Sequence, residues 1–170
     1  DQGLLSLNRF NSPQLDADAV LPLQVGKAGL QVGALQSNVR LRAYPLSRVG
    51  FLLGTVMDGT VAAAGEIRGP LQSLQPDLQI EVNSPRAGAI RLVESWKGRF
   101  EGRPGGGGQL QMASVGAVIP GSLRAQLGSN WLPESVRLQR RKGELQISGS
   151  PALYRWTAND MNVDGLELVL

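Results

Sequence analysis

Carboxylates are the acid–base candidates in this sequence, because it contains neither histidine nor cysteine. Asp16 with Asp18, and Asp160 with Asp164, are spaced closely enough for the two-carboxylate chemistry of a hydrolase. The second pair is flanked by asparagine and glycine, which is typical of turns in which a side chain hydrogen-bonds the local backbone. We favour this structural interpretation over a catalytic carboxylate pair. The sequence therefore predicts no catalytic residue, and we expect that the protein is not an enzyme.

A run of four glycines, Gly105 to Gly108, has the composition of a phosphate-binding loop. Such loops need a strand before them, a helix after them and a Lys-Ser/Thr pair, and none of these follows. We therefore predict a hairpin tip over Gly102–Gly108 that has nothing apolar to bury. Without histidine or cysteine, the sequence also indicates no metal site and no cofactor.

The basic run from Arg140 to Lys142 is suited either to binding an anionic headgroup or to forming the solvated turn of a hairpin. Charged residues at strand ends commonly serve the second purpose, which we favour. A net charge of +3 over 170 residues is modest, so no nucleic-acid partner is expected. No run of apolar residues is long enough to predict a transmembrane segment. The chain begins at Asp1 and ends in Leu-Val-Leu, and we expect it to be a fragment of a longer protein.

Three tryptophans are candidates for a sugar-stacking platform: Trp96, Trp131 and Trp156. Trp96 and Trp156 lie in alternating runs on the same side as aliphatic residues. Their placement favours packing in a core over ligand stacking.

Short alternating runs separated by glycine and proline make up most of the chain. With 22 glycines, 10 prolines and only 5% aromatic residues, the composition suits many short strands and tight corners. The Asp58-Gly59 dipeptide predicts a tight hairpin turn between strands over 51–57 and 60–67. For residues 14–21, a turn of helix and an edge strand both remain open. No window of helical length has a 3.6-residue period, so the sequence predicts an all-β fold.

Alternation also predicts which side chains share a face. Apolar residues alternate with glutamine, arginine and glutamate in each run, so one face is aliphatic and the other polar. The residues expected to line a shared apolar surface are Leu78, Ile80, Leu110, Met112, Leu123, Leu127, Leu138, Leu145 and Ile147. With few rings to fill a thick core, this face is poorly matched to a compact sandwich and suits an open groove.

A repeated phrase in this chain resembles the TamB (translocation and assembly module) family of AsmA-like bridge proteins. Residues 65–71 read GEIRGPL and residues 76–82 read PDLQIEV, so a strand ends in Gly-Pro-Leu and an alternating strand follows a second proline. The segments GSPALYRW (149–156) and MNVDGL (161–166) fit the same style. The resemblance is best over 54–170, and the composition is similar to that of cyanobacterial or plastid-type members.

The resemblance implies that residues 1–170 are one β-rich fragment of a longer TamB-like chain. It implies an elongated antiparallel or mixed sheet folded lengthwise into a groove (β-taco-like) with an aliphatic interior. Family members are anchored in the inner membrane and cross the periplasm, or the intermembrane space of the envelope in plastid relatives. Their expected partners are phospholipid acyl chains and an outer-membrane β-barrel assembly-factor protein. No functional residue carries over one by one.

The expected function is therefore non-enzymatic: a segment of an envelope-spanning bridge that carries phospholipid along an apolar groove, supports outer-membrane protein assembly, or does both. Two alternatives remain. In one, the sheet edge is a scaffold or chaperone for strands of outer-membrane or imported client proteins. In the other, the chain forms a closed β-sandwich spacer.

Overall fold

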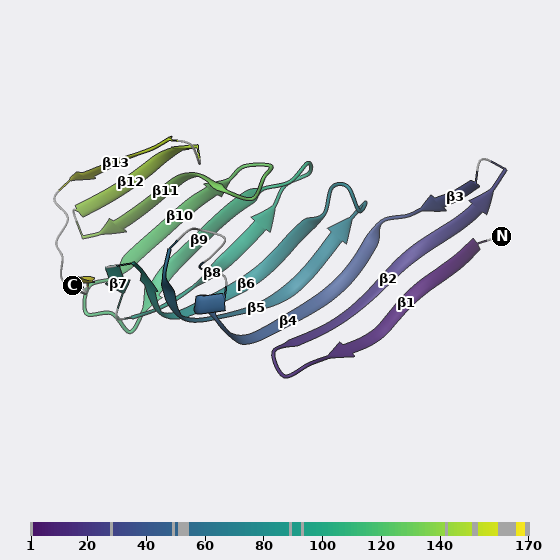
Figure 1. Cartoon of the computed structure of the whole chain (residues 1–170), viewed down its shortest axis with the longest axis horizontal. Coiled ribbons are helices and arrows are strands. Elements are labelled where there is room, and N and C mark those ends of the chain that lie inside the picture. Colours follow the sequence, from purple (N-terminus) through teal and green to yellow (C-terminus); the bar gives the residue numbers. More distant parts are fainter. Residues whose placement is uncertain are drawn as a thin grey trace.

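The computed structural model of the chain describes residues 2–27, 29–48, 50, 55–88, 90–92, 94–141, 143–150, 153–159 and 166–168. They form one 14-stranded sheet (Figure 1). The strands are β1 (Gln2–Asn11), β2 (Leu15–Gly26), β3 (Gly29–Val32), β4 (Leu35–Pro45), β5 (Met57–Gly69), β6 (Gln75–Ala87), β7 (Ile90–Leu92), β8 (Ser95–Gly102), β9 (Gly108–Val115), β10 (Gly121–Leu127), β11 (Pro133–Arg140), β12 (Gly143–Ser150), β13 (Leu153–Asn159) and β14 (Leu166–Leu168).

The sheet is open and antiparallel. Its main path runs β1-β2-β4-β5-β6-β8-β9-β10-β11-β12-β13, while β3 pairs with β2, and β14 pairs with β7, which itself pairs with β6. The all-β prediction is confirmed: in the described part of the chain the one helical element is a short 3-10 turn, η1 (Leu46–Arg48). None of the described residues belongs to a helix long and apolar enough to cross a membrane. The region 14–21, left open by the sequence, lies mostly in β2.

Close approach of neighbouring strands depends on glycine at one central position. Gly98 lies in the middle of β8, opposite Met112 of β9. A Cβ atom at Gly98 would overlap the carbonyl oxygen of Gln111, so any other residue would push these two strands apart. Glycine is unfavourable in a strand in general, and here the tight pairing of β8 with β9 explains its presence.

The prediction of a hairpin turn at Asp58-Gly59 is wrong. Both residues lie inside β5, where the register with β6 shifts between Asp58 and Thr60, which marks a β-bulge. Gly59 takes a φ of 99°, and its amide donates a hydrogen bond of 2.7 Å to Oδ1 of Asp58. The same local preference for positive φ that favours a tight turn also suits a bulge, and the pairing of β5 with β6 decides between them. The expected preceding strand lies partly outside the described residues.

The hairpin tip predicted over Gly102–Gly108 does connect two strands, β8 and β9, but it is packed and not free. The amide of Gly105 donates to Oγ of Ser73 at 2.7 Å, and Gly107 is buried against the backbone of Gly128. The tip has no large apolar side chain to bury, as expected, but its backbone packs in a way that the sequence analysis did not predict. The tip needs no apolar side chain because its backbone makes the contacts.

Burial divides the sheet into two halves. The N-terminal half comprises β1 to β5 and the C-terminal half comprises β6 to β14. Apart from Leu46, every buried hydrophobic residue in the described part of the chain belongs to the C-terminal half: Trp96, Phe100, Met112, Ile119, Ala125 and Leu138. The N-terminal half instead exposes large aliphatic side chains at its outer end. The core therefore fills one half of the molecule and leaves the other open.

Candidate functional site

Two continuous rows of apolar residues cross the sheet from strand to strand. Residues directly opposite each other in an antiparallel pair project from the same face, so the strand register defines each row. The first apolar row is Leu15, Leu41, Ala63, Ile80, Gly98, Met112, Leu123, Leu138, Leu145 and Ala158. The second apolar row is Phe10, Ala17, Val39, Gly65, Leu78, Phe100, Leu110, Ala125, Val136, Ile147 and Trp156.

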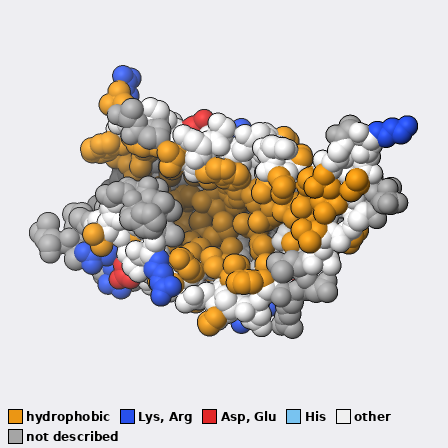
Figure 2. Space-filling model, turned by 45° about the vertical axis from the view of Figure 1, so that its right-hand side comes forward, with side chains coloured by type: hydrophobic (Ala, Val, Ile, Leu, Met, Phe, Trp, Pro, Cys, Tyr) orange, Lys and Arg blue, Asp and Glu red, His pale blue; other side chains and the backbone are white. Residues whose placement is uncertain are grey.

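These rows line the concave face of the curled sheet, which we call the groove. Figure 2 shows a hollow lined by hydrophobic side chains between two rims that carry other side chains. No charged side chain interrupts either row between β1 and β13. The groove therefore offers an apolar path along the sheet, perpendicular to its strands.

The predicted lining residues lie on this face with one partial exception. Ile80, Met112, Leu123, Leu138 and Leu145 lie in the first apolar row. Leu78, Leu110 and Ile147 lie in the second. Leu127 ends β10 beyond both rows, where the register with β11 shifts and Leu127 faces Gly108 and Pro133. Whether any of these side chains contacts a lipid stays a prediction.

The sequence prediction missed the continuation of the groove into the N-terminal half. Leu15, Ala17, Val39 and Leu41 extend both rows across β2 and β4. The signal was present, because apolar residues alternate with aspartate over 15–19 and with arginine over 39–43. Small residues on β5, such as Ala63, were harder to assign to the apolar or the polar face, since alanine is common on either face of a sheet.

The groove is filled in one part and open in another. Under β8 to β11, Trp96, Met112 and Leu138 form a buried cluster, with Leu110 and Leu123 among the partly buried residues packed against it. Under β2 to β5 the rows carry smaller side chains, and none of their described members is buried. An acyl-sized ligand therefore has more room at the N-terminal half of the groove.

One rim of the C-terminal half is closed by a tryptophan and a buried ion pair. Trp96 is 2% exposed, and a Cβ atom at Gly121 would lie 2.7 Å from its ring. Arg140, also 2% exposed, forms an ion pair with Glu94, whose side chain is equally withdrawn from water. Burial lowers the pKa of the Arg140 guanidinium. The prediction that the 140–142 turn is wholly solvated is therefore wrong for Arg140.

Of the two tryptophans that we expected to pack in the core, one is buried and the other is exposed. Trp96 packs in the core as predicted, but Trp156 is 72% exposed although it continues the second apolar row. Trp156 lies on β13, the last strand of the main path, so no further described strand covers it. Trp131 lies 6.0 Å from the ring of Phe100.

The convex face is polar, and some of its arginines are paired with carboxylates. A row between the two apolar rows reads Asp16, Arg40, Ala64, Gln79, Arg99, Gln111, Arg124, Arg137, Gln146 and Thr157. Hydrogen bonds of 2.7 and 2.6 Å from Arg99 lower the pKa of the Asp77 carboxyl. Arg137 pairs with Glu144 at 2.8 Å in the same way. These exposed pairs are typical of a solvated surface.

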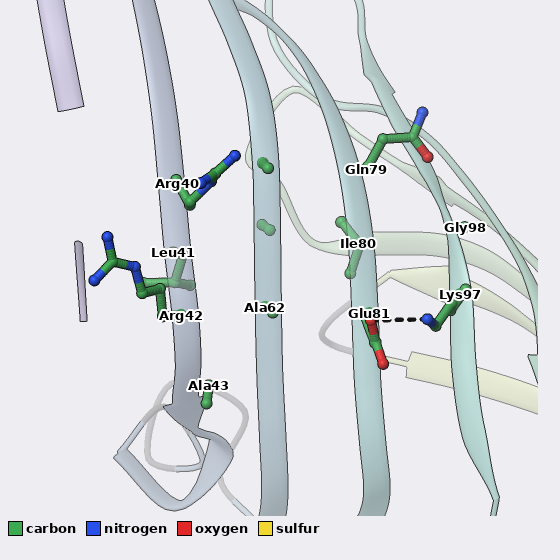
Figure 3. Close-up of a pocket in the computed structure, with 12 residues that line it drawn as sticks. Arg40, Leu41, Arg42, Ala43, Ala62, Gln79, Ile80, Glu81, Lys97 and Gly98 are labelled. Atoms are coloured by element: carbon green, nitrogen blue, oxygen red, sulfur yellow. Dashed lines mark ion pairs between the residues drawn. The ribbon is translucent and has the colours of Figure 1, made fainter. Parts of the chain in front are cut away.

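A shallow depression of about 460 Å³ lies across β4, β5, β6 and β8 (Figure 3). Ala62 leaves space between the longer side chains of its neighbours, with Arg40 reaching toward β5 and Arg42 pointing away. Lys97 Nζ lies 3.2 Å from Oε2 of Glu81, so the charges beside the depression are already paired. Its lining combines side chains of the convex face with Leu41, Ala63, Ile80 and Gly98, which belong to the first apolar row.

The first candidate carboxylate pair has structural partners. Asp16 forms an ion pair with Arg42, and Oδ2 of Asp18 accepts a hydrogen bond of 3.0 Å from Nδ2 of Asn38. Asp160 and Asp164 lie outside the described residues. Within the described ranges, no group of three or more acidic, histidine or cysteine side chains is arranged to hold a metal ion. The groove is thus the feature with the clearest ligand-binding shape.

Comparison with protein-family models, with curated proteins and with solved structures gives no match. The TamB resemblance therefore stays a hypothesis, and any function must be argued from the groove itself.

Proposed function

We propose that this chain is a non-enzymatic, lipid-carrying segment in which phospholipid acyl chains move along the groove. The observation that carries the proposal is the pair of apolar rows, which run without a charged residue through ten and eleven strands of an open sheet. Hydrocarbon moved from water to such a surface gains roughly 0.8 kcal/mol for each buried CH₂ group. The polar side chains of the convex face are hydrated, so only the concave face of the sheet is available to acyl chains.

The TamB resemblance supports the same proposal and extends it. On that hypothesis the chain is part of a periplasmic or envelope-spanning bridge whose parent protein is anchored in the inner membrane and meets an outer-membrane β-barrel assembly factor. The groove would then be one stretch of a longer path between two membranes.

A charge in the open part of the groove tests the proposal. Leu41→Asp places a carboxylate in the first apolar row, away from the buried cluster around Trp96, so the variant is expected to fold. Gln36→Asp is the matched control, because it adds the same charge to an exposed position of the same strand. Binding of a phospholipid with a fluorescent acyl chain should fall at least tenfold in Leu41→Asp and stay unchanged in Gln36→Asp.

Three results would count against the groove. If Leu41→Asp binds the labelled phospholipid normally, this face is not the path. If the variant cannot fold, the face is a closed core, as in the spacer alternative. If wild-type protein neither co-purifies with lipid nor binds the probe, the proposal is wrong.

A second candidate function is a strand-adding scaffold for client proteins. The observation in its favour is β13, in which all seven residues are exposed and Leu153 and Trp156 remain uncovered. Among the described strands β13 ends the main path, and an edge strand can pair with an extended peptide through main-chain hydrogen bonds. Photocrosslinking to an extended β-strand peptide from both Arg155 and Trp156, which lie on opposite faces of β13, would support it, and crosslinking only at convex-face positions of other strands would not.

A further inference from the structure

A short segment lies over the concave face of the C-terminal half. It consists of β7 and the nearby Glu94, and we call it the cover. Figure 1 shows β7 at one rim of the sheet, beside the C-terminal end of the chain, where β14 pairs with it. Leu92, at the end of β7, packs against the buried cluster of Trp96, Met112 and Leu138. The cover therefore lies over the first apolar row, to which Met112 and Leu138 belong.

The cover is tied across the sheet by a buried ion pair. Glu94 precedes β8, whereas its partner Arg140 ends β11, three strands further along the main path. Neighbouring strands lie about 4.8 Å apart, so three steps of a flat sheet span roughly 14 Å. The ion pair thus bridges β9 and β10 and does not join neighbouring strands.

Small residues beneath the ion pair leave room for it. Trp96 of β8 lies opposite Ser114 of β9. Arg140 lies opposite Gly121 of β10, whose amide donates a hydrogen bond of 2.7 Å to Oγ of Ser114. A Cβ atom at Gly121 would lie 2.7 Å from the Trp96 ring and 3.3 Å from the Arg140 side chain. The Trp96 ring therefore extends from β8 as far as β10, and with Arg140 it fills the space under the cover.

The backbone contributes little to holding the cover in place. β7 has three residues, and it pairs with β6 at two register positions and with the equally short β14 at three. Nε1 of Trp96 is buried and has no hydrogen-bond acceptor among the residues that the structure describes. A buried donor without an acceptor is unfavourable, and contact with water would satisfy it. Side-chain contacts, above all the Glu94–Arg140 pair, therefore hold the cover closed.

We propose that the cover is a movable closure of the groove, which the Glu94–Arg140 pair keeps shut and whose release opens the first apolar row from β8 onward to an acyl chain. The continuity of that row carries the inference. Its residues continue through β9, β10, β11 and β12 without a charge, although the cover and the Trp96 ring close this part of the row. The acyl chain rests on the proposed function, whereas the closure itself does not.

Cysteine labelling tests the closure without lipid, because the chain has no cysteine of its own. Leu123→Cys places a thiol in the first apolar row, among the residues packed against the buried cluster. In this background Glu94→Met should raise the rate of maleimide labelling at least about tenfold, because it leaves the Arg140 guanidinium buried without the carboxylate. Glu94→Met/Arg140→Met should restore the slow rate, since a buried ion pair can be replaced by apolar side chains of similar volume.

Two controls separate movement of the cover from a general loosening of the core. Glu144→Met removes the carboxylate of the exposed pair with Arg137 and should leave the labelling rate unchanged. Ala125→Cys places the thiol at a buried position of the second apolar row, and it should stay slow to label in the Glu94→Met background. If Ala125→Cys is labelled faster by the same factor as Leu123→Cys, the ion pair holds the whole core together and the proposal is wrong.

Hydrogen exchange on the unmodified chain tests the closure even if Glu94→Met does not fold. The amides of β7 and the indole N–H of Trp96 should exchange together, with a lower opening free energy than the amides of β9, because the cover opens without global unfolding. If the indole N–H exchanges only on global unfolding, the cover does not open in the folded protein, and the proposal is overturned.

A phospholipid with a photoreactive group in its acyl chain tests what the opening admits. In wild-type protein the crosslinks should map to β2, β4, β5 and β6, and Glu94→Met should extend them to Leu123 and Leu145. Equal crosslinking of Leu123 and Leu145 in both proteins would overturn the inference, because the cover would not limit the path. If neither protein is crosslinked in the groove, the acyl chain and the proposed function are both wrong, while the labelling rates still decide on the closure.

Discussion

The two halves of this sheet follow the same alternation but differ in what covers their apolar face. In the C-terminal half, Trp96, Met112 and Leu138 fill the concave side and pack against one another. In the N-terminal half, alanines and smaller aliphatic residues on β2 and β5 leave that side open. The comparison shows that alternation determines which face is apolar, whereas side-chain volume determines whether that face becomes a core or a groove.

The largest difference is expected for tryptophan removal in the two environments. Trp96→Ala should lower the free energy of unfolding by about 3–5 kcal/mol, because a large ring leaves a cavity in a packed cluster. Trp156→Ala should cost less than about 1 kcal/mol, since only cross-strand contacts are lost. Urea denaturation of both variants measures the contrast. Equal losses would mean that β13 is packed as tightly as the core.

A smaller effect is expected when a methyl group is added to glycine. Gly121→Ala brings a Cβ atom against the Trp96 ring and the Arg140 side chain, which should cost about 1–3 kcal/mol through overpacking. Gly26→Ala, at the end of β2, meets nothing within 4 Å and should be neutral or slightly stabilising. Thermal melts of the two variants compare the halves directly. A marked loss in Gly26→Ala would show that the end of β2 is covered by another surface.

The smallest effect is expected on the convex face, where the halves should behave alike. Asp77→Asn removes the pair with Arg99 and should lower stability slightly near neutral pH. Because the pair lowers the folded-state pKa of Asp77, its contribution is present above the unfolded value of about 3.9 and is lost as pH falls through the folded value. Melts of wild type and variant should therefore converge at low pH. Arg99→Gln should show the same convergence, and a difference that persists in acid would contradict the assignment.

The class of fold and most of the groove could be predicted from local pattern. Period-two alternation in runs such as 78–82 and 145–147 fixes which side chains share a face, whatever the partner strands are. An open sheet, in place of a closed sandwich, could be predicted from the composition, because few aromatic rings are available to fill a thick core.

Features that depend on pairing partners could not be predicted. The Asp58-Gly59 bulge has the local signature of a hairpin turn, and its register with β6 is a long-range property. The burial of Arg140 depends on Glu94, which is distant in sequence, and on Gly121, whose small size leaves room for the Trp96 ring and the Arg140 side chain. The exposure of Trp156 depends on its place at the end of the strand order, and single runs of residues carry no information about that order.

Nearly every hydrogen-bonded neighbour in this sheet is also close along the chain. From β8 to β13 each strand pairs with the next in a hairpin, whereas the pairing of Ile90 with Leu168 joins distant segments. Short loops close at little entropic cost, so hairpins can add to a growing edge one after another, as repeats do in a solenoid. Such a chain can acquire structure as it is synthesised, without waiting for its C-terminus, and the pairing of β14 with β7 is then among the last events.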